Sequence, residues 1–368
     1  MPHNGRLGAL DDTVGRAATS KGYGRKRGLV IQLRAAETRT HIRKPLRALT
    51  MTLLYTDPCF LEHQTGAHPE CPERLEAILR RLSERELTGR CVLPKWEAVT
   101  PERLARVHSL RYAEEVARFA CGGGGRIEVD TVVSPRSYEV ALRAAGAACD
   151  AVSRVLRDED RSALCLVRPP GHHALPAGAM GFCLFNNVAV GARAAVEDFG
   201  LARVLIVDWD VHHGNGTQDM FFDDGRVAFY SVHRSPFYPG TGAADESGAG
   251  AGLGLTKNLP LRIGIERADY LGRVRTTLAD FADKVRPELV IVSAGFDAHR
   301  LDPVGSLGLE TEDYGELTEL VLEIAAVHAK SRIVSVLEGG YNVEMLADSV
   351  ALHLERLLQR DARATPGA

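Results

Sequence analysis

One stretch of the chain, residues 204–217, carries residues whose types and spacing suit metal chemistry. It begins with the apolar run Val204-Leu-Ile-Val207, which is typical of a strand whose two faces are covered by helices. Side chains alternate along an extended backbone, so Asp208, Asp210 and His212 are expected on one side. Buried carboxylates beside an imidazole repel one another unless a cation lies between them. A divalent metal ion would satisfy this arrangement, and solvated capping residues at a strand end are the simpler alternative.

A further candidate ligand, Asp297, follows another predicted strand. Together with Asp210 and His212 it forms a set of three oxygen and nitrogen ligands that leaves one position open for water, as in catalytic zinc sites. A hard ion held by oxygen alone would require more ligands, and the same set also suits Fe(II) or Co(II). The residues therefore predict one catalytic metal ion, with zinc as the preferred identity.

Two adjacent histidines, His172 and His173, follow Arg168-Pro-Pro-Gly171, where the glycine turn could direct both imidazoles toward the metal. Such a pair suits general acid and base chemistry, which contributes roughly 10²–10⁴-fold in rate. Each ring would need a partner that orients it, and Asp208 and Asn215 are the natural candidates. The alternative is that one histidine is structural.

The loop after a later strand contains Tyr341, directly behind Gly339 and Gly340. A phenol brought close to a metal-bound carbonyl would stabilise the oxyanion, an effect of about 3–4 kcal/mol. Aromatic residues Phe182, Phe237 and Tyr238 lie in loops expected at the same rim, where two rings could form a slot for an aliphatic chain. Each ring could equally belong to the core.

The elements that must position these residues alternate along the chain from residue 51 onward. We expect strands over residues 52–55, 162–167, 203–208, 227–232, 288–293 and 332–337, and helices over residues 72–87, 135–157, 186–199, 267–284, 312–330 and 343–359, with another helix after Pro101 and a Gly-rich loop over residues 240–254. This order predicts a single α/β domain with a mostly parallel central sheet flanked by helices. Every polar motif follows the carboxyl end of a predicted strand, where such sheets bind ligands.

The amino-acid composition indicates the class of protein and its cellular setting. The 368 residues have the apolar and charged fractions of a soluble globular protein, and no apolar run reaches the length of a membrane span. We therefore expect no membrane association. Seven widely spaced cysteines without a C-x-x-C pair argue against a disulfide framework and indicate a reducing, cytoplasmic setting.

Charge is distributed unevenly, since residues 1–50 hold 11 Lys and Arg against 3 Asp and Glu, a net charge of +8 within a total of −3. We expect a basic, disordered arm over residues 1–50, a catalytic domain over residues 51–360 and a tail over residues 361–368. The composition favours a solvated arm over one that binds nucleic acid, and a start codon placed too far upstream of Met51 would explain it equally well.

Several motifs in order make the chain resemble the histone deacetylase family of zinc-dependent deacylases, especially class II and its bacterial amidohydrolase relatives. The motifs are His68-Pro-Glu-Cys-Pro-Glu-Arg-Leu75, Arg168-Pro-Pro-Gly-His-His-Ala174, Met180-Gly-Phe-Cys-Leu-Phe-Asn-Asn187, Asp208 to Gly216, Ser293-Ala-Gly-Phe-Asp-Ala298 and Glu338-Gly-Gly-Tyr-Asn342. The likeness covers about residues 52–358, and Asn215 stands where class I carries Asp, which supports the class II assignment.

The resemblance implies the arginase/deacetylase fold and a role for each matching residue. Asp210, His212 and Asp297 would be the zinc ligands, His172 and His173 the histidine pair, and Tyr341 the residue that assists at the carbonyl oxygen, while Gly181, Phe182 and Tyr238 would line the acyl-lysine tunnel. A structural potassium ion is also implied, around Asp208, Asp210, His212, Ser231 and Val232.

The implied activity is removal of acetyl or similar short acyl groups from N-ε-acyl-lysine through attack by metal-activated water. His173 would be the base and His172 its electrostatic partner or acid, an assignment that could be reversed. The substrate would be an acylated protein or a small acylated amine. Polyamine-specific relatives carry a Glu where this chain has Val304 in Asp302-Pro-Val-Gly305, which favours acyl-lysine over acetylpolyamine. An acetylpolyamine amidohydrolase and a catalytically silent acyl-lysine reader remain alternatives, and the intact Tyr341 argues against the reader.

Overall fold

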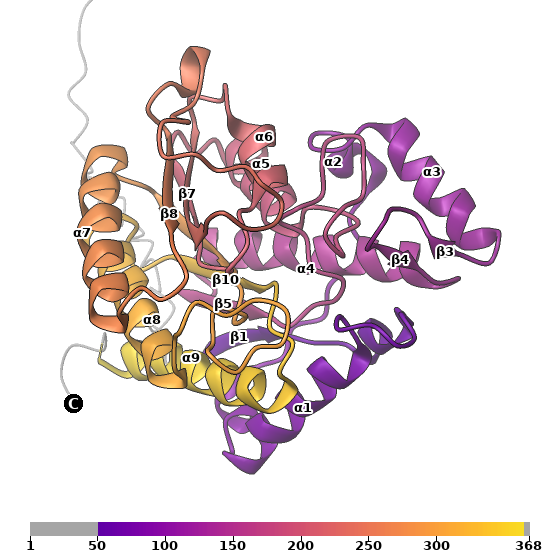
Figure 1. Ribbon diagram of the computed structural model, residues 1–368, viewed down its shortest axis with the longest axis horizontal. Coiled ribbons are helices and arrows are strands. Elements are labelled where there is room, and N and C mark those ends of the chain that lie inside the picture. The colour runs from indigo at the N-terminus through magenta and orange to yellow at the C-terminus, as the bar shows by residue number, and fades with distance from the viewer. Residues whose placement is uncertain (1–50, 364–368) are drawn as a thin grey trace, which may run out of the picture. The chain divides into compact units, whose positions relative to one another are not determined.

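Eight strands in the described part of the chain, residues 51–363, form one sheet in which every neighbouring pair is parallel (Figure 1). In spatial order they are β2 (Cys91–Val92), β1 (Thr52–Tyr55), β5 (Ser162–Cys165), β10 (Ile333–Leu337), β9 (Leu289–Ala294), β6 (Val204–Asp208), β7 (Val227–Arg234) and β8 (Thr256–Leu261). The predicted single domain with a mostly parallel sheet is confirmed in this computed structural model. The predicted arm over residues 1–50 and residues 364–368 of the predicted tail lie outside the described residues.

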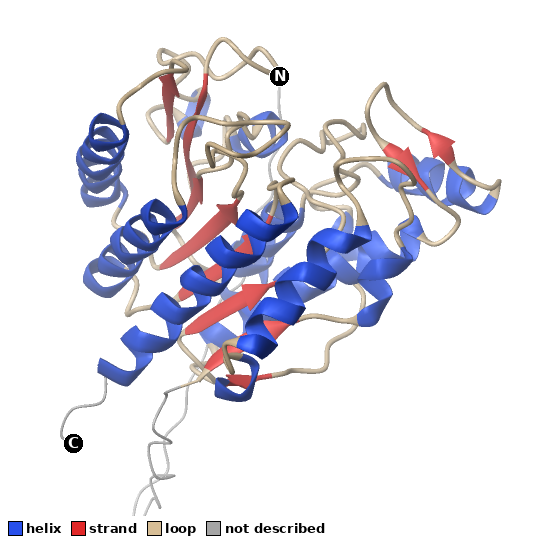
Figure 2. Cartoon of the chain, turned by 60° about the horizontal axis from the view of Figure 1, so that its bottom comes forward, coloured by secondary structure: helices blue, strands red, loops and turns tan. Residues whose placement is uncertain are grey.

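Helices cover both faces of the sheet (Figure 2). One layer contains α1 (Pro72–Glu84), α9 (Val343–Arg363), α8 (Thr311–His328) and α7 (Arg267–Val285), packed in that order, and the other contains α2 (Pro101–Leu104), α3 (Leu110–Cys121), α4 (Ser137–Leu156), α5 (Asn187–Phe199) and α6 (Asn215–Phe221). A short antiparallel hairpin, β3 (Gly125–Arg126) and β4 (Val132–Val133), is separate from the main sheet. Among the described helices, none has the length and apolar content needed to cross a bilayer.

The central strands read as continuous apolar runs because both of their faces are buried. All residues of β5, β6, β9 and β10 are buried. On one face the long helix α4 packs closely against α5 through small side chains: a Cβ on Gly191 would lie 3.5 Å from the Cβ of Ala148. The helices packed on both faces hold the strands in place. They therefore also determine where the loops at the carboxyl ends of the strands begin.

Several elements differ from the expectation, and the following two have a clear local cause. The helix expected over residues 72–87 ends at Glu84, because Glu86 adopts a left-handed conformation (φ 55°) and the amide of Leu87 donates to the carbonyl of Leu82. Strand β8 is not predicted by the sequence pattern, because its residues, Thr-Lys-Asn-Leu-Pro-Leu, are poor in strand formers and include Pro260. Pro is tolerated there because β8 is an edge strand. All seven cysteines are free.

Candidate active site

The loops after β6 and β9 bring together the three residues predicted to bind a metal. One ligand atom from each of Asp210, His212 and Asp297 lies within 4.8 Å of the other two, and all three residues are buried. Nδ1 of His212 lies 3.0 Å from Oδ1 of Asp210 and 3.1 Å from Oδ2 of Asp297. Strands β6 and β9 are adjacent, with Asp208 paired to Ser293, so the two loops start side by side.

The electrostatics of this cluster fit a cation. Burial, and then the charge of Asp210, raise the pKa of Asp297 to about 7, so the metal-free protein avoids two bare carboxylates at this point. Burial opposes protonation of His212, but its close contacts with the carboxylates of Asp210 and Asp297 raise its pKa to about 10. Oδ2 of Asp297 is buried and has no hydrogen-bond partner among the described residues. A buried carboxylate oxygen that accepts no hydrogen bond and lies beside a second carboxylate and an imidazole is typical of a metal ligand set.

The backbone of Gly339, in the loop after β10, packs directly against the carboxylates of the cluster. The amide of Gly339 donates to Oδ2 of Asp210 at 2.9 Å. A Cβ at Gly339 would lie 2.3 Å from Oδ2 of Asp297 and 2.5 Å from Oδ2 of Asp210. The position therefore requires glycine for the loop to approach the carboxylates this closely.

His172 lies behind this cluster. Its Nδ1 is 2.9 Å from Oδ2 of Asp208, and its Nε2 is 3.8 Å from Oδ1 of Asp210. Burial alone would lower the pKa of His172, but the charges of Asp208 and Asp210 raise it well above 6.5, so the ring is an imidazolium. Its backbone is held by Glu338, whose Oε2 accepts hydrogen bonds from the amides of Gly171 (2.6 Å) and His172 (3.2 Å). Burial raises the pKa of Glu338 to about 7.

The ring of His173, in contrast to that of His172, is held in its neutral form. Its ring centroid is 4.0 Å from that of His172, and its Nδ1 is 2.8 Å from Oδ1 of Asn215. Burial, followed by the positive charges of His172 and His212, lowers the pKa of His173 well below 6.5. A neutral ring whose Nδ1–H donates to an amide oxygen keeps its Nε2 lone pair free. His173 can therefore accept a proton, whereas the raised pKa of His172 favours its protonated form.

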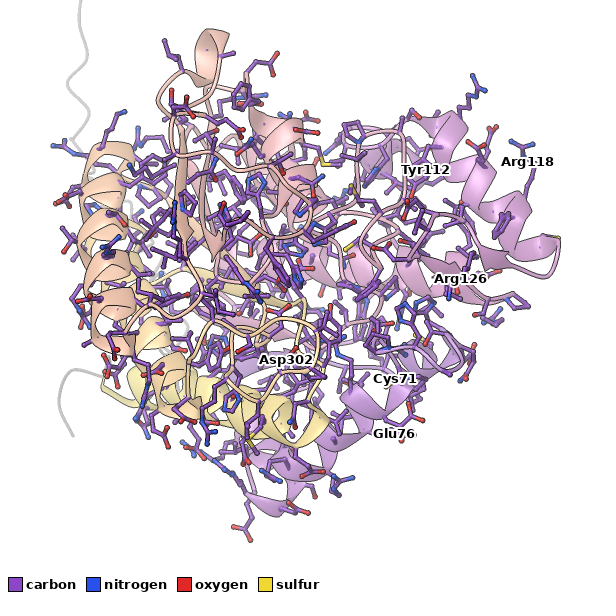
Figure 3. The ribbon with its side chains drawn as sticks, viewed as in Figure 1. Cys71, Glu76, Tyr112, Arg118, Arg126 and Asp302 are labelled. Carbon is purple, nitrogen blue, oxygen red and sulfur yellow. The ribbon has the colours of Figure 1, made fainter. Side chains whose placement is uncertain are left out.

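Tyr341 lies in the loop after β10 and lines the cavity that leads to the cluster of Asp210, His212 and Asp297. Burial, and then the charges of Asp297 and Asp210, raise its pKa well above 10.0, so the phenol keeps its proton and can donate a hydrogen bond. Two side chains fix this loop. Arg74 of α1 donates from Nε to the carbonyl of Gly340 at 2.6 Å and lies over the Tyr341 ring at 5.0 Å. Asp302, in the loop between β9 and α8 (Figure 3), accepts from the Tyr341 amide at 2.6 Å.

A cavity of about 210 Å³ leads to the cluster. It is lined by Asp130, His173, Gly181, Phe182, His212, Phe237, Tyr238, Val304 and Tyr341. The predicted tunnel residues Gly181, Phe182 and Tyr238 all belong to this lining, and Phe237 stacks on the His212 ring with centroids 5.2 Å apart. The walls are mostly apolar, which suits an aliphatic chain, and His173, His212, Tyr341 and Asp130 supply the polar groups of the lining.

A tight turn over residues 180–183 forms one wall of the cavity. Gly181 (φ 56°) and Phe182 (φ 70°) both have left-handed backbones, and the amide of Cys183 donates to the carbonyl of Met180 at 2.9 Å. A bulky residue in this conformation is strained. The turn is held by Asp130, whose Oδ1 accepts from the Gly181 amide, and by Thr131, whose Oγ accepts from the Phe182 amide, both at 3.1 Å.

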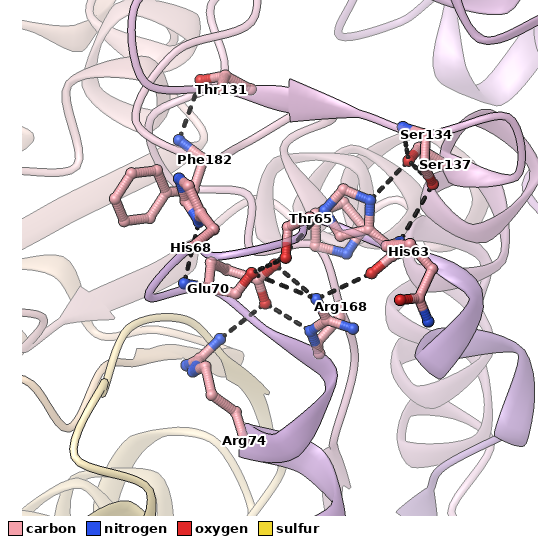
Figure 4. Close-up of polar contacts among 12 residues, drawn as sticks. His63, Thr65, His68, Glu70, Arg74, Thr131, Ser134, Ser137, Arg168 and Phe182 are labelled. Atoms are coloured by element: carbon pink, nitrogen blue, oxygen red, sulfur yellow. Dashed lines mark hydrogen bonds and ion pairs between the residues drawn. The ribbon is translucent and has the colours of Figure 1, made fainter. Parts of the chain in front are cut away.

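A buried ionic network joins the early motif to the loops that carry the histidine pair and Tyr341 (Figure 4). Glu70 pairs with Arg168 (2.6 Å) and with Arg74 (3.0 Å), and all three side chains have no exposed surface. Arg168 begins the segment that carries the two histidines, and Arg74 holds the loop that carries Tyr341. The positive charge of Arg168 and a hydrogen bond from His63 hold the pKa of Glu70 well below 4.5 against the effect of burial.

The residues predicted for potassium lie on β6, on the loop that follows it and on the adjacent strand β7. Asp208 of β6 is paired with Ser231 of β7, and Val232 follows Ser231. The amide of Asp210 donates to Oδ1 of Asp208 at 3.1 Å, and Oγ of Ser231 lies 3.0 Å from Nδ1 of His233. Asp208 and Ser231 are therefore neighbours, next to the start of the loop that carries Asp210 and His212.

Comparison with known proteins identifies the family. Residues 68–357 match the histone deacetylase domain. The chain is 42% identical over 306 residues to an uncharacterized protein of Synechocystis sp., covering 81% of this chain and 97% of the relative. It is 41% identical over 306 residues to human polyamine deacetylase HDAC10, covering 79% of this chain and 45% of that protein. The crystal structure of the HDA15 HD domain superposes with a TM-score of 0.80 at 36% identity, covering 84% of this chain and 89% of that one.

The chain therefore belongs to the histone deacetylase family, whose members are deacetylases and amidohydrolases.

Sequence reasoning missed several residues that shape the site. Asp130 sits in a segment without any recognisable motif, and only the folded chain brings it to Gly181. The role of Arg74 could not be predicted either, because the residues that it contacts, Gly340 and Tyr341, lie far away in the sequence. Glu70 could have been suspected as a charged residue inside the early motif, but its two arginine partners come from separate elements.

Proposed function

We propose that the protein is a zinc-dependent hydrolase that removes acetyl or similar short acyl groups from N-ε-acyl-lysine. The observation that supports this most directly is the convergence of Asp210, His212 and Asp297 beside Tyr341 and the histidine pair, at the inner end of an apolar cavity. Asp210, His212 and Asp297 would hold the zinc ion. When bound, zinc would polarise the substrate carbonyl and make the attacking water more acidic.

The chain's own residues would carry the remaining steps. Neutral His173, with its Nε2 lone pair free, takes a proton from water and returns it to the departing amine. His172 stays charged against Asp208 and stabilises negative charge that develops nearby. The phenol of Tyr341 donates to the carbonyl oxygen, where a single such donor contributes about 3–4 kcal/mol. Phe182 and Tyr238 would bind the methylene chain of lysine, and Phe237 packs over His212.

The potassium ion implied by the resemblance would lie beside Asp208 and Ser231 and would stabilise the start of the loop that carries Asp210 and His212. The adjacent pairing of Asp208 and Ser231 supports this proposal. The role would be structural, because these groups lie behind the cavity lining.

An acetylpolyamine substrate is the second candidate. It is favoured by the relative named polyamine deacetylase and by Asp130, whose carboxylate lines the cavity and could face a distal ammonium. Against it, Val304 lines the same cavity and supplies no charge. We therefore prefer acyl-lysine.

A paired turnover assay tests both proposals. The zinc-loaded protein and its Tyr341→Phe variant would be compared on an acetyl-lysine peptide and on N-acetylputrescine. We expect peptide turnover that falls about 10²–10³-fold in the variant. Turnover of the polyamine alone would transfer the proposal to the second candidate. Tight binding of the peptide without hydrolysis would instead indicate an acyl-lysine reader.

A further inference from the structure

The side-chain amide of Asn215 has two ends that are nearly equal in shape and opposite in chemistry. Its oxygen faces Nδ1 of His173 at 2.8 Å, and its nitrogen donates to Sδ of Met180 at 3.2 Å. We propose that Met180 is a positioning residue, whose thioether selects the amide orientation that keeps His173 in the tautomer able to act as a base. This inference rests on the proposed function for its catalytic consequence, but its structural part does not.

The selection follows from what each group can donate. A thioether sulfur accepts hydrogen bonds weakly and has no hydrogen to donate. If the amide of Asn215 turned over, its oxygen would face Met180 and lose its partner in a buried site, which costs about 1–3 kcal/mol. Its NH₂ would then face Nδ1 of His173, so the ring proton would have to move to Nε2. That proton would occupy the lone pair that His173 offers to the cavity.

The tight turn over residues 180–183 is what brings the sulfur to this place. Met180 is its first residue, and Gly181 and Phe182 are its two left-handed residues. Asp130 and Thr131 fix the turn from outside by accepting from its amides. One local structure therefore presents Phe182 to the cavity and Met180 to Asn215.

An amide at position 215 needs a neighbour that selects its orientation, whereas a carboxylate there would not. Both oxygens of an aspartate accept hydrogen bonds, so a carboxylate at position 215 would hold the Nδ1–H of His173 in either orientation. The effect of Met180 should consequently depend on the residue at position 215. A double-mutant cycle measures this dependence directly.

The experiment uses the zinc-loaded full chain, with Met180→Leu, Asn215→Asp and the double variant. Leucine conserves volume and removes the acceptor, and Met180→Ala is a second variant without an acceptor. Met220→Leu, at a partly buried position that packs against the core near the end of α6, is the matched control. Two quantities are measured: the tautomer of His173 by NMR of ¹⁵N-histidine-labelled protein, and kcat on the acetyl-lysine peptide.

We expect the native chain to show His173 protonated at Nδ1, and Met180→Leu to populate the Nε2–H form and to lower kcat in proportion, about twofold when the two amide orientations are equal in energy, with little change in KM. In the Asn215→Asp background, Met180→Leu should change neither quantity. An unchanged tautomer in Met180→Leu and Met180→Ala would overturn the proposal, as would equal losses of kcat in both backgrounds, which indicate packing alone. If the native chain hydrolyses neither substrate, the proposed function fails, and the tautomer alone decides the role of Met180.

Discussion

The carboxylate of Asp302 accepts a hydrogen bond from the backbone amide of Tyr341, with 2.6 Å between Oδ2 and N. The same oxygen accepts from the amide of Asn342 at 3.2 Å, and Oδ1 accepts from the amides of Val304 and Gly305, both at 2.9 Å. One side chain thus ties the loop that carries the phenol to the loop that carries the cavity-lining valine.

Replacing Asp302 by Asn should loosen both loops. An amide retains one accepting oxygen and turns a donating NH₂ toward backbone N–H groups, so two hydrogen bonds are lost at a cost of about 1–3 kcal/mol. Displacement of a catalytic group by 1 Å can lower turnover about 10²-fold. We expect a large fall in kcat for Asp302→Asn, measured on the acetyl-lysine peptide. The variant Asp245→Asn, at an exposed position, is the control. Equal activity of the two variants would contradict a role for Asp302 in holding the two loops.

Gly181 should tolerate no side chain. A Cβ there would lie 2.3 Å from Cδ2 of His173, in addition to the strain of a positive φ. Gly66 has a similar backbone (φ 68°), but a Cβ added to it would meet no heavy atom within 4 Å. Both Gly→Ala changes should therefore lower the free energy of unfolding by about 1–3 kcal/mol, but only Gly181→Ala should also reduce kcat by an order of magnitude or more. Chemical denaturation and turnover assays separate the two effects.

The metal ligands should lower stability in the absence of a metal. Asp210 and Asp297 are buried carboxylates that converge, and one oxygen of Asp297 has no partner among the described residues. We expect zinc to raise the midpoint of thermal unfolding, with a stabilisation of about 2.7 kcal/mol at a hundred times the dissociation constant. Asp297→Asn should abolish this rise and, with chelator present above pH 7, should unfold at a higher temperature than the native chain. A zinc-induced rise that persists in Asp297→Asn would show that the ion binds elsewhere.

His108 should make the fold sensitive to acid. Its Nδ1 lies 3.0 Å from the carbonyl of Leu175, so Nδ1 donates, and Nε2 accepts from the amide of Asn186 at 2.9 Å. Burial lowers its pKa from 6.5 to about 4. The unfolded chain therefore binds the proton first, and stability that is present above pH 6.5 is lost as the pH falls to about 4.

The loss amounts to about 3 kcal/mol if the full difference in pKa is expressed. Urea titrations of the native chain and of His108→Gln between pH 4 and 7 would measure it. Glutamine can donate and accept at similar positions without titrating, so its pH dependence should be shallower. The control is His328→Gln, which alters a partly exposed ring. Parallel curves for all three proteins would exclude His108 as the source.

The parallel sheet and most loops of the site could be predicted because their signals are local. Apolar runs such as Val204 to Val207 end in polar motifs, and the alternation of strands and helices leaves few possible topologies. Strand β8 could not be predicted, because an edge strand needs neither an apolar run nor a complete set of amide donors.

Contacts between distant elements escaped sequence reasoning for a different reason. Nothing in the local sequence of Asp130 or Arg74 states which backbone groups their side chains will bind. The orientation of the Asn215 amide was equally inaccessible, since it involves a contact with the sulfur of Met180, a residue far away in the sequence. Residue types indicate which chemistry is available, and the tertiary packing decides which atoms face one another.

The parallel order of the strands also bears on how the protein folds. Asp210 follows β6 and Asp297 follows β9, and the helix α7 together with β7 and β8 separates them in the chain. The ligand set consequently does not exist in any short contiguous fragment and forms only when β6 and β9 have paired. Contacts of such long sequence separation form slowly, because the loop between them must close first. Uptake of the metal ion during refolding should therefore be a late event that reports completion of the central sheet.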